Sequence, residues 1–227
     1  MAINAIISYD DSLSDHDALM FGHVLSEIGA RLTLAYVRHT TRDRPDHERL
    51  DAGAADALLA RGAAWLQDAS AESRVVLSGS TAEGLAWLAA NEPADVVVFG
   101  SEYRTPHGHV STCRSAQRLL ERSPAAVAIA PAGYRVSPRE IATVGVLPGT
   151  ADEAAIETAF SIAARLEASV VDRAHNVDLL IVGSRRDAAE GVVSISASAQ
   201  NAIEDATCPV LVVARGVALH FDTLVTA

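Results

Sequence analysis

The sequence predicts an α/β fold made of two tandem open parallel sheets, the second of them truncated. Apolar runs of strand length alternate with stretches of helical spacing, which is typical of parallel strands joined by crossover helices. Several segments of the first half recur later in the chain. The recurring part is shorter than the original, so it has room for fewer elements. We place a complete domain at residues 1–135 and a truncated copy, ending in an edge strand, at residues 139–227.

The first two strands and helices of the complete domain follow from hydrophobic spacing. "AINAIISYD" is an Ile-rich run that predicts a buried strand. The next stretch has helical spacing, with Ser14 as its N-cap and Gly29 at its end. "RLTLAYV" predicts the second strand, and the Ala- and Leu-rich stretch from Asp46 to Ala69 predicts the second helix.

The remaining elements of this domain continue the alternation. "SRVVLSG" predicts a third strand, and a capping box of Ser80 and Glu83 opens a third helix. "DVVVFG" predicts the fourth strand, a helix is expected from about Cys113 to Arg122, and "AAVAIA" predicts the fifth strand. Five strands and four helices therefore make up the complete domain.

An internal repeat is visible in the sequence. "ADVVVFGSEYR" is echoed by "VDLLIVGSRRD", and "SAQRLLERSPAAVAIAPAG" by "SAQNAIEDATCPVLVVARG". "IATVGVLPGTADEAAIETAFSIAARL" similarly echoes the first strand and helix. Repeats of this kind predict a tandem duplication.

The second copy lacks its middle. After Leu166 only about ten residues precede the strand "VDLLIVG", too few for two further strands with their crossovers. Val170, Val171 and Ala174 share one helical face with Leu166, so we expect the helix to continue to about His175.

The tail of the chain has a strand-like pattern. Apolar Val217, Leu219 and Phe221 alternate with polar or small residues in "VALHFDTLV". This spacing predicts an extra edge strand that can pair with a partner.

Composition limits the classes of function. With 227 residues, of which 49% are hydrophobic and 21% charged, the chain can bury a sizeable core. A net charge of −11 argues against binding to nucleic acid or anionic membranes, because both need a basic surface. The sequence has no membrane-spanning run, no signal-peptide pattern and only two cysteines, so we expect a cytoplasmic protein.

Several of these segments resemble the universal stress proteins, a group with an adenine-nucleotide alpha-hydrolase-like fold. "YDDS" is similar to the family's "VDGS", and "RLTLAYV", "ADVVVFGS" and "ATCPVLVV" match in order and spacing. The resemblance covers most of the chain. It implies a doubly wound sheet of strand order 3-2-1-4-5. It also implies that the two copies pair through their last strands, as separate subunits do in single-domain members.

The resemblance also implies a nucleotide site in the first copy, for ATP or AMP. Family members hold adenine and ribose near an Asp after the first strand, and phosphates on a glycine loop and the following helix N-terminus. Backbone N–H groups and the helix dipole suit an anion at such a place. Carried over by position, the candidate residues are Asp10, Tyr36, Val37, Gly100, Ser101, Arg104, Gly108, Ser111, Thr112, Arg114 and Ser115.

Departures from the family pattern fall where phosphate would bind. Tyr103 occupies the position of the family's second Gly, and Cys113 with Arg114 replaces the "GS" that opens the helix. Arg104 and Arg114 could supply charge instead. In the second copy Pro148 replaces the Asp and Arg186 the second Gly. We therefore expect an incomplete site in the first copy and no nucleotide in the second.

Alternative readings of these residues stay open. Asp10 could cap the first helix or complete a turn, while Gly100 simply ends a buried strand. His107, His109 and Cys113 have soft metal-ligand chemistry, but we favour a polar loop and expect no metal site. Cys113 beside Arg114 could be a low-pKa thiol or a small buried substitute for Gly.

Three functional hypotheses follow. The first is a stress-response regulator or sensor with an incomplete adenine-nucleotide site. The second is an interaction or scaffold protein that binds no nucleotide and acts as a homodimer or an intramolecular pseudo-dimer. A slow ATPase ranks third, on fold analogy alone. No catalytic constellation is recognisable in the sequence, so we expect no enzyme.

Overall fold

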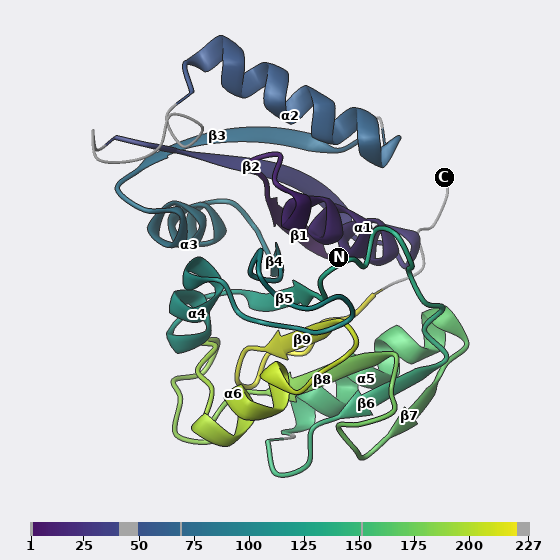
Figure 1. Ribbon diagram of the computed structural model, residues 1–227. Coiled ribbons are helices and arrows are strands. Elements are labelled where there is room, and N and C mark those ends of the chain that lie inside the picture. Colours follow the sequence, from purple (N-terminus) through teal and green to yellow (C-terminus); the bar gives the residue numbers. More distant parts are fainter. Residues whose placement is uncertain (1, 41–49, 69, 151, 222–227) are drawn as a thin grey trace.

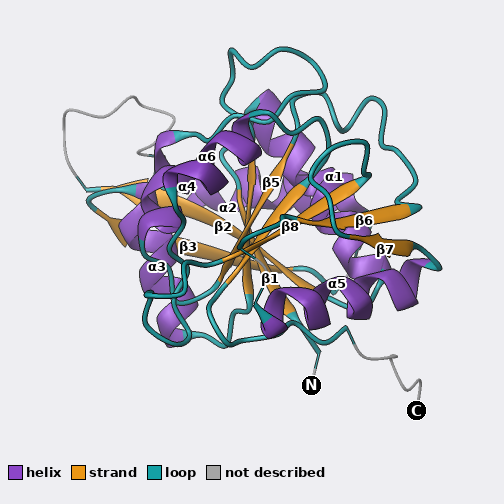
Figure 2. Ribbon diagram, turned by 90° about the horizontal axis from the view of Figure 1, so that it is seen from below, coloured by secondary structure: helices purple, strands orange, loops and turns teal. Residues whose placement is uncertain are grey.

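A computed structural model describes residues 2–40, 50–68, 70–150 and 152–221 of the chain. One nine-stranded sheet, of order β3-β2-β1-β4-β5-β9-β8-β6-β7, runs through the molecule (Figure 1). Helices lie on both sides of it (Figure 2). Alternate strand residues face opposite core layers, as Ile7 and Ile6 do. Helices α1, α2 and α5 close one layer, and α3, α4 and α6 close the other.

The first half contains five parallel strands in the order β3-β2-β1-β4-β5, which confirms the expected 3-2-1-4-5 arrangement. Its elements are β1 (Asn4–Ser8), α1 (Leu13–Glu27), β2 (Arg31–His39), α2 (Ala52–Leu66), β3 (Glu72–Ser78), α3 (Thr81–Asn91), β4 (Val96–Gly100), α4 (Arg114–Glu121) and β5 (Ala126–Ala130).

Two helix starts differ from expectation. Ser12, not Ser14, is the N-cap of α1, because the Ser12 hydroxyl accepts from the Asp15 amide while the Asp15 carboxylate reaches back to the Ser12 amide. Helix α2 begins after its N-cap Asp51 and ends at Gln67, whose backbone is left-handed. The predicted positions 46–49 and 69 lie outside the described residues.

The second half contains β6 (Thr143–Val146), α5 (Glu153–Leu166), β7 (Ser169–Val171), β8 (Leu179–Gly183), α6 (Ala197–Glu204) and β9 (Val210–Val213). The expected helix to His175 is wrong. Glu167 is left-handed and ends α5, so residues 169–171 form β7 beside β6. The short connection back to β8 crosses β6 closely, because a Cβ at Gly145 would meet the Arg173 carbonyl and the Val177 side chain.

The halves meet at their last strands. β5 and β9 pair antiparallel, with Ala128 opposite Leu211, which is the pairing that the resemblance implies. The chain thus forms internally the contact expected between subunits. The division into a complete domain and a truncated copy remains a prediction.

The described part of the tail does not form an edge strand. Leu219 and Phe221 are buried, and their amides donate to the hydroxyls of Thr158 and Ser161 on α5. Apolar contact with the α5 core layer, rather than strand pairing, therefore explains the alternating pattern. Positions 222–225 of the predicted strand lie outside the described residues.

Candidate functional site

The candidate site lies where the carboxyl ends of β1, β2 and β4 meet, the usual ligand position in an open parallel sheet. Asp10 follows β1, Tyr36 and Val37 belong to β2, and Gly100 ends β4. A side chain at Gly100 would collide with the Ser14 backbone carbonyl. Gly100 therefore lets α1 begin directly against β4.

Asp10 completes the turn before α1. Its Oδ1 accepts from the Ser12 amide at 3.1 Å, and its own amide donates to Asp15 Oδ2 at 2.6 Å. Burial, together with the neighbouring Asp10 carboxylate, raises the pKa of Asp15 well above its usual range. These contacts match the turn reading of Asp10.

Asp11 forms a cluster that sequence reasoning missed. Its backbone is left-handed, with φ 70°, and its carboxylate accepts from Tyr9 Oη at 2.7 Å and from Arg61 Nη2 at 2.8 Å. His16 Nε2 lies 3.1 Å from the same carboxylate. Although burial acts to raise it, these hydrogen bonds lower the pKa of Asp11 to about 2. Arg61 lies on α2, so the contact could not be read from local spacing.

The two β2 residues offer little side-chain surface. Tyr36 is 1% and Val37 6% exposed, and their side chains enter opposite core layers. Tyr36 Oη accepts from the Leu50 amide at 3.1 Å. Any contact of this strand end with a base is therefore a backbone contact.

Ser101 fastens the loop after β4. Its hydroxyl is buried, donates to the Ala130 carbonyl at 2.7 Å and accepts from the Ser111 amide at 3.2 Å. The loop is thereby closed onto the end of β5. The Ser101 hydroxyl is committed to this task.

The loop also satisfies much of its own backbone. Gly108 is left-handed and its amide donates to the Ala132 carbonyl, so it acts as a turn residue. Tyr103 is 74% exposed and lies under the Arg104 guanidinium, 5.0 Å from the ring centre. Seven amides between β4 and α4 donate to protein oxygens, those of Glu102, Arg104, Thr105, Gly108, His109, Val110 and Ser111.

The residues at the start of α4 are divided between two surfaces. Thr112 is buried, and its hydroxyl accepts from the side-chain amides of Gln117 on α4 and Gln200 on α6. Ser115 is half-buried and Arg114 is exposed. The structure therefore directs Thr112 toward the other half of the chain rather than toward the strand ends.

Cys113 does not have a lowered pKa. Burial raises the pKa of its thiol, and the nearby amides of Ser115 and Ala116 oppose this only in part. Cys113 is the half-buried N-cap of α4, and its role as a substitute for Gly stays a prediction. Among the described residues no group of His, Cys, Asp and Glu is arranged to hold a metal ion.

Arg104 and Ser111 line a separate cavity of about 330 Å³. Glu102, His109 and Glu204 of α6 line it too, while Asp10, Tyr36 and Gly100 do not. Part of the predicted phosphate side therefore lines a cavity that the predicted base-side residues do not line.

The second half repeats this loop fastening. Ser184 donates to the Val213 carbonyl at 2.7 Å and accepts from the Ser194 amide at 3.2 Å, as Ser101 does with Ala130 and Ser111. The cross-contacts are reciprocal as well, because Val110 donates to Ala206 and Val193 donates to Ser123. In both halves, therefore, the serine of the Gly-Ser pair holds the loop against the end of the neighbouring strand.

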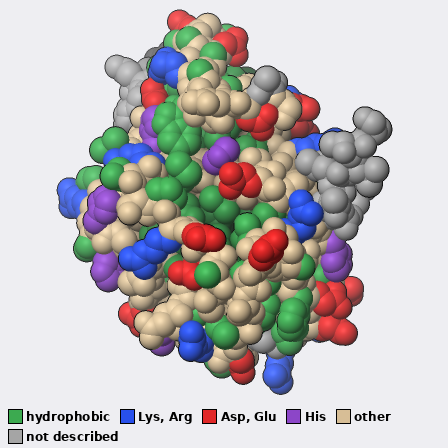
Figure 3. Space-filling model, turned by 90° about the vertical axis from the view of Figure 1, so that its right-hand side faces the viewer, with side chains coloured by type: hydrophobic (Ala, Val, Ile, Leu, Met, Phe, Trp, Pro, Cys, Tyr) green, Lys and Arg blue, Asp and Glu red, His purple; other side chains and the backbone are tan. Residues whose placement is uncertain are grey.

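The surface fits the acidic composition. On the face shown in Figure 3, acidic, basic and histidine side chains are interspersed around a central band of apolar ones. That face offers no continuous basic surface for nucleic acid. Of the helices that the structure describes, none is long and apolar enough to cross a bilayer.

Comparisons with known proteins agree with the fold. The universal stress protein of Archaeoglobus fulgidus DSM 4304 is 14% identical over 94% of this chain and 98% of its own, with a TM-score of 0.71. A putative universal stress protein of Pseudomonas aeruginosa UCBPP-PA14 is 14% identical over 93% of both chains, with a TM-score of 0.64. A functionally unknown protein of Pseudomonas aeruginosa PAO1 gives the same identity and TM-score over 93% of this chain and 92% of its own.

At this identity the solved structures establish a shared fold alone. No curated protein matches the sequence. The model of the universal stress protein family matches residues 4–131, the segment that holds β1 to β5 and the loop described above. Because this match spans more than half of the sequence, the chain belongs to the universal stress protein family.

Proposed function

We propose that this protein is a non-enzymatic, cytoplasmic regulator of stress responses whose first-half cleft takes the adenosine part of a nucleotide and does not hold its phosphates. The backbone of the loop after β4 carries this proposal. A phosphate cradle needs N–H groups that point at the anion. Here seven of those groups already donate to oxygens of the protein.

The charges near the strand ends act in the same direction. Asp10 lies at the start of α1, where its carboxylate repels phosphate. Arg61 is paired with Asp11, so its charge is already compensated. Phosphoryl transfer depends on holding the phosphates and their metal in place, and this arrangement supports binding without turnover.

Calorimetry with adenosine, AMP and MgATP tests the proposal. We expect the three dissociation constants to agree within about threefold, because the phosphates contribute less than about 0.7 kcal/mol. Asp10→Asn should weaken all three equally, since Asn keeps the Oδ1 contact with the Ser12 amide but changes the second oxygen. Asp172→Asn, an exposed and distant change of the same kind, is the control. MgATP binding about a hundredfold tighter than adenosine would overturn the proposal.

A second candidate is an interaction protein that binds no nucleotide and dimerises through α5. Ile156 and Phe160, one turn apart on this helix, are 42% and 58% exposed. In the first half, α2 packs beside α1 and its Trp65 ring contacts the ring of His16; β7 is followed by no such helix. The self-complementary apolar pair favours a second copy of the chain.

Sedimentation separates the two candidates. If the second holds, the protein sediments as a dimer, Phe160→Glu makes it monomeric, and neither adenosine nor AMP nor MgATP binds. A monomer that binds adenosine supports the first candidate and removes the second.

A further inference from the structure

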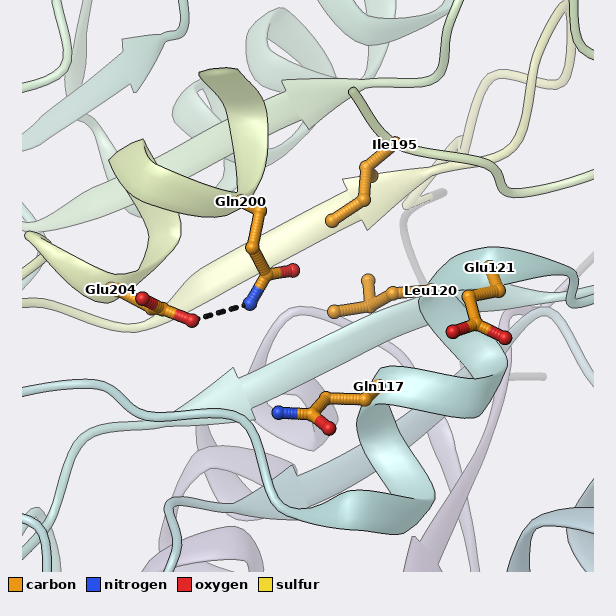
Figure 4. A pocket seen from close by; sticks show the side chains of 6 residues that line it. All are labelled: Gln117, Leu120, Glu121, Ile195, Gln200 and Glu204. Atoms are coloured by element: carbon orange, nitrogen blue, oxygen red, sulfur yellow. Dashed lines mark hydrogen bonds between the residues drawn. The ribbon is translucent and has the colours of Figure 1, made fainter. Parts of the chain in front are cut away.

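A groove between α4 and α6 lies apart from the base-side residues described above and shares only Glu204 with the cavity that Arg104 and Ser111 line. It encloses about 330 Å³ where the two halves meet (Figure 4). Its lining residues are Gln117, Leu120, Glu121, Ile195, Gln200 and Glu204.

The lining comes from the internal repeat. Each Ser-Ala-Gln triplet lies in a helix, and its Gln is followed four residues later by a Glu. Gln117 and Glu121 of α4 and Gln200 and Glu204 of α6 therefore face the same groove from opposite sides. The groove is therefore approximately symmetric, because each half contributes one glutamine and one glutamate to its lining.

Hydrogen bonds set the polarity of the groove. The side-chain nitrogens of both glutamines donate to Thr112, and that of Gln200 also donates to Glu204 Oε1 at 2.7 Å. With the nitrogens committed, each glutamine presents its carbonyl oxygen as an acceptor. The groove thus offers carboxylate and amide oxygens to a ligand that donates hydrogen bonds.

The middle of the groove is apolar. Figure 4 shows the two carboxylates at opposite ends, with Leu120 and Ile195 between them. Leu120 is only 1% exposed and Ile195 is half-buried, so Ile195 supplies most of the accessible apolar surface. A ligand matched to this lining is cationic and donor-rich at both ends and aliphatic in between.

We propose that this groove binds an α,ω-diamine, with one ammonium group at Glu121, the other at Glu204, and the methylene chain over Leu120 and Ile195. Glu121 and Glu204 are exposed, and an exposed ion pair alone is weak. Two ion pairs to one ligand, joined by a chain that buries apolar surface, reinforce one another because the second contact is intramolecular. This site is independent of the nucleotide cleft of the proposed function.

Calorimetry of the full chain with butane-1,4-diamine, in buffer of near-physiological salt, tests the proposal. Butylamine is the control ligand, since it has one ammonium group and a similar chain. We expect the diamine to bind at least about tenfold more tightly than butylamine, as a second ion pair of about 1.4 kcal/mol requires. Glu121→Gln and Glu204→Gln should each remove that advantage. Magnesium ion alone should not compete, because the carboxylates lie at opposite ends of the groove.

A matched pair of variants guards against general charge attraction in an acidic protein. Glu153→Gln and Glu157→Gln remove the same charge from two exposed positions of α5, a helix that does not line the groove. They should change diamine affinity by less than about twofold, because distant surface charges are screened. Equal loss in both pairs, equal affinity for butylamine and diamine, competition by magnesium, or no binding by the wild-type chain would each overturn the proposal.

Discussion

Replacing Ser101 by Ala should destabilise the fold measurably, and replacing Ser184 by Ala should do so to the same degree. Both hydroxyls are nearly inaccessible, at 1% and 2% residue exposure, and each makes one donated bond of 2.7 Å and one accepted bond of 3.2 Å. Each truncation leaves a buried carbonyl and a part-buried amide without this partner. Such losses cost about 1–3 kcal/mol, so we expect about 2 kcal/mol for each variant.

Urea unfolding followed by circular dichroism measures this cost, and the thermal midpoint should fall by about 4–8 °C for a chain of this size. Ser73→Ala is the control, because Ser73 is exposed on the edge strand β3 and the change should stay within about 0.5 kcal/mol. If Ser101→Ala and Ser184→Ala were as stable as the control, the hydrogen bonds of the two hydroxyls would not stabilise the loops. A loss of stability in Ser101→Ala alone would contradict the equivalence of the two serines.

Three further predictions concern stability. The folded-state pKa of Asp11 is lowered to about 2, so its contribution to stability is present above about pH 4 and is lost as the pH falls through 2. Urea unfolding at several pH values should therefore show that the unfolding free energy of the wild-type chain falls by about 1 kcal/mol more over this interval than that of Asp11→Asn. Gly145→Ala should lower the unfolding free energy by about 2 kcal/mol, since the new methyl group meets the Arg173 carbonyl, and a melting temperature equal to wild type would show that the crossing is not tight. Gly53→Ala, in the exposed first turn of α2, should instead raise stability by about 0.5–1 kcal/mol, and a fall would contradict the assigned helix.

Local patterns predicted the first half of the fold well. Buried strands such as β4 and β5 are short continuous apolar runs, and helix starts such as that at Ser80 have local capping signals. The strand order followed from the resemblance and agrees with the structure. These features depend on residues close together in the sequence or on motifs of fixed spacing.

The parts that failed depend on contacts between distant residues. Residues 169–171 have an apolar spacing that fits a helix, but β6 supplies a strand edge and Gly145 supplies the room for the return loop. Likewise Leu219 and Phe221 alternate as in a strand, yet the hydroxyls of α5 bind their backbone. Spacing alone cannot distinguish these outcomes, because it does not show which partner is nearby.

The candidate site was predicted only in outline. Position identified Asp10 and Gly100, which do lie at neighbouring strand ends. It could not show that Thr112 turns toward Gln200 of the other half, or that Arg61 reaches Asp11 from α2. Those contacts arise from the packing of the halves and of α1 against α2.

Amide hydrogen exchange across the loop from Gly100 to Cys113 tests the central claim most directly. If the loop satisfies its own backbone, the amides of Gly108, Val110 and Ser111 exchange slowly in the free protein, and MgATP leaves their rates unchanged. Rapid exchange in the free protein that becomes slow on adding MgATP would show that these amides bind phosphate, and would contradict the proposal that the loop does not hold the phosphates.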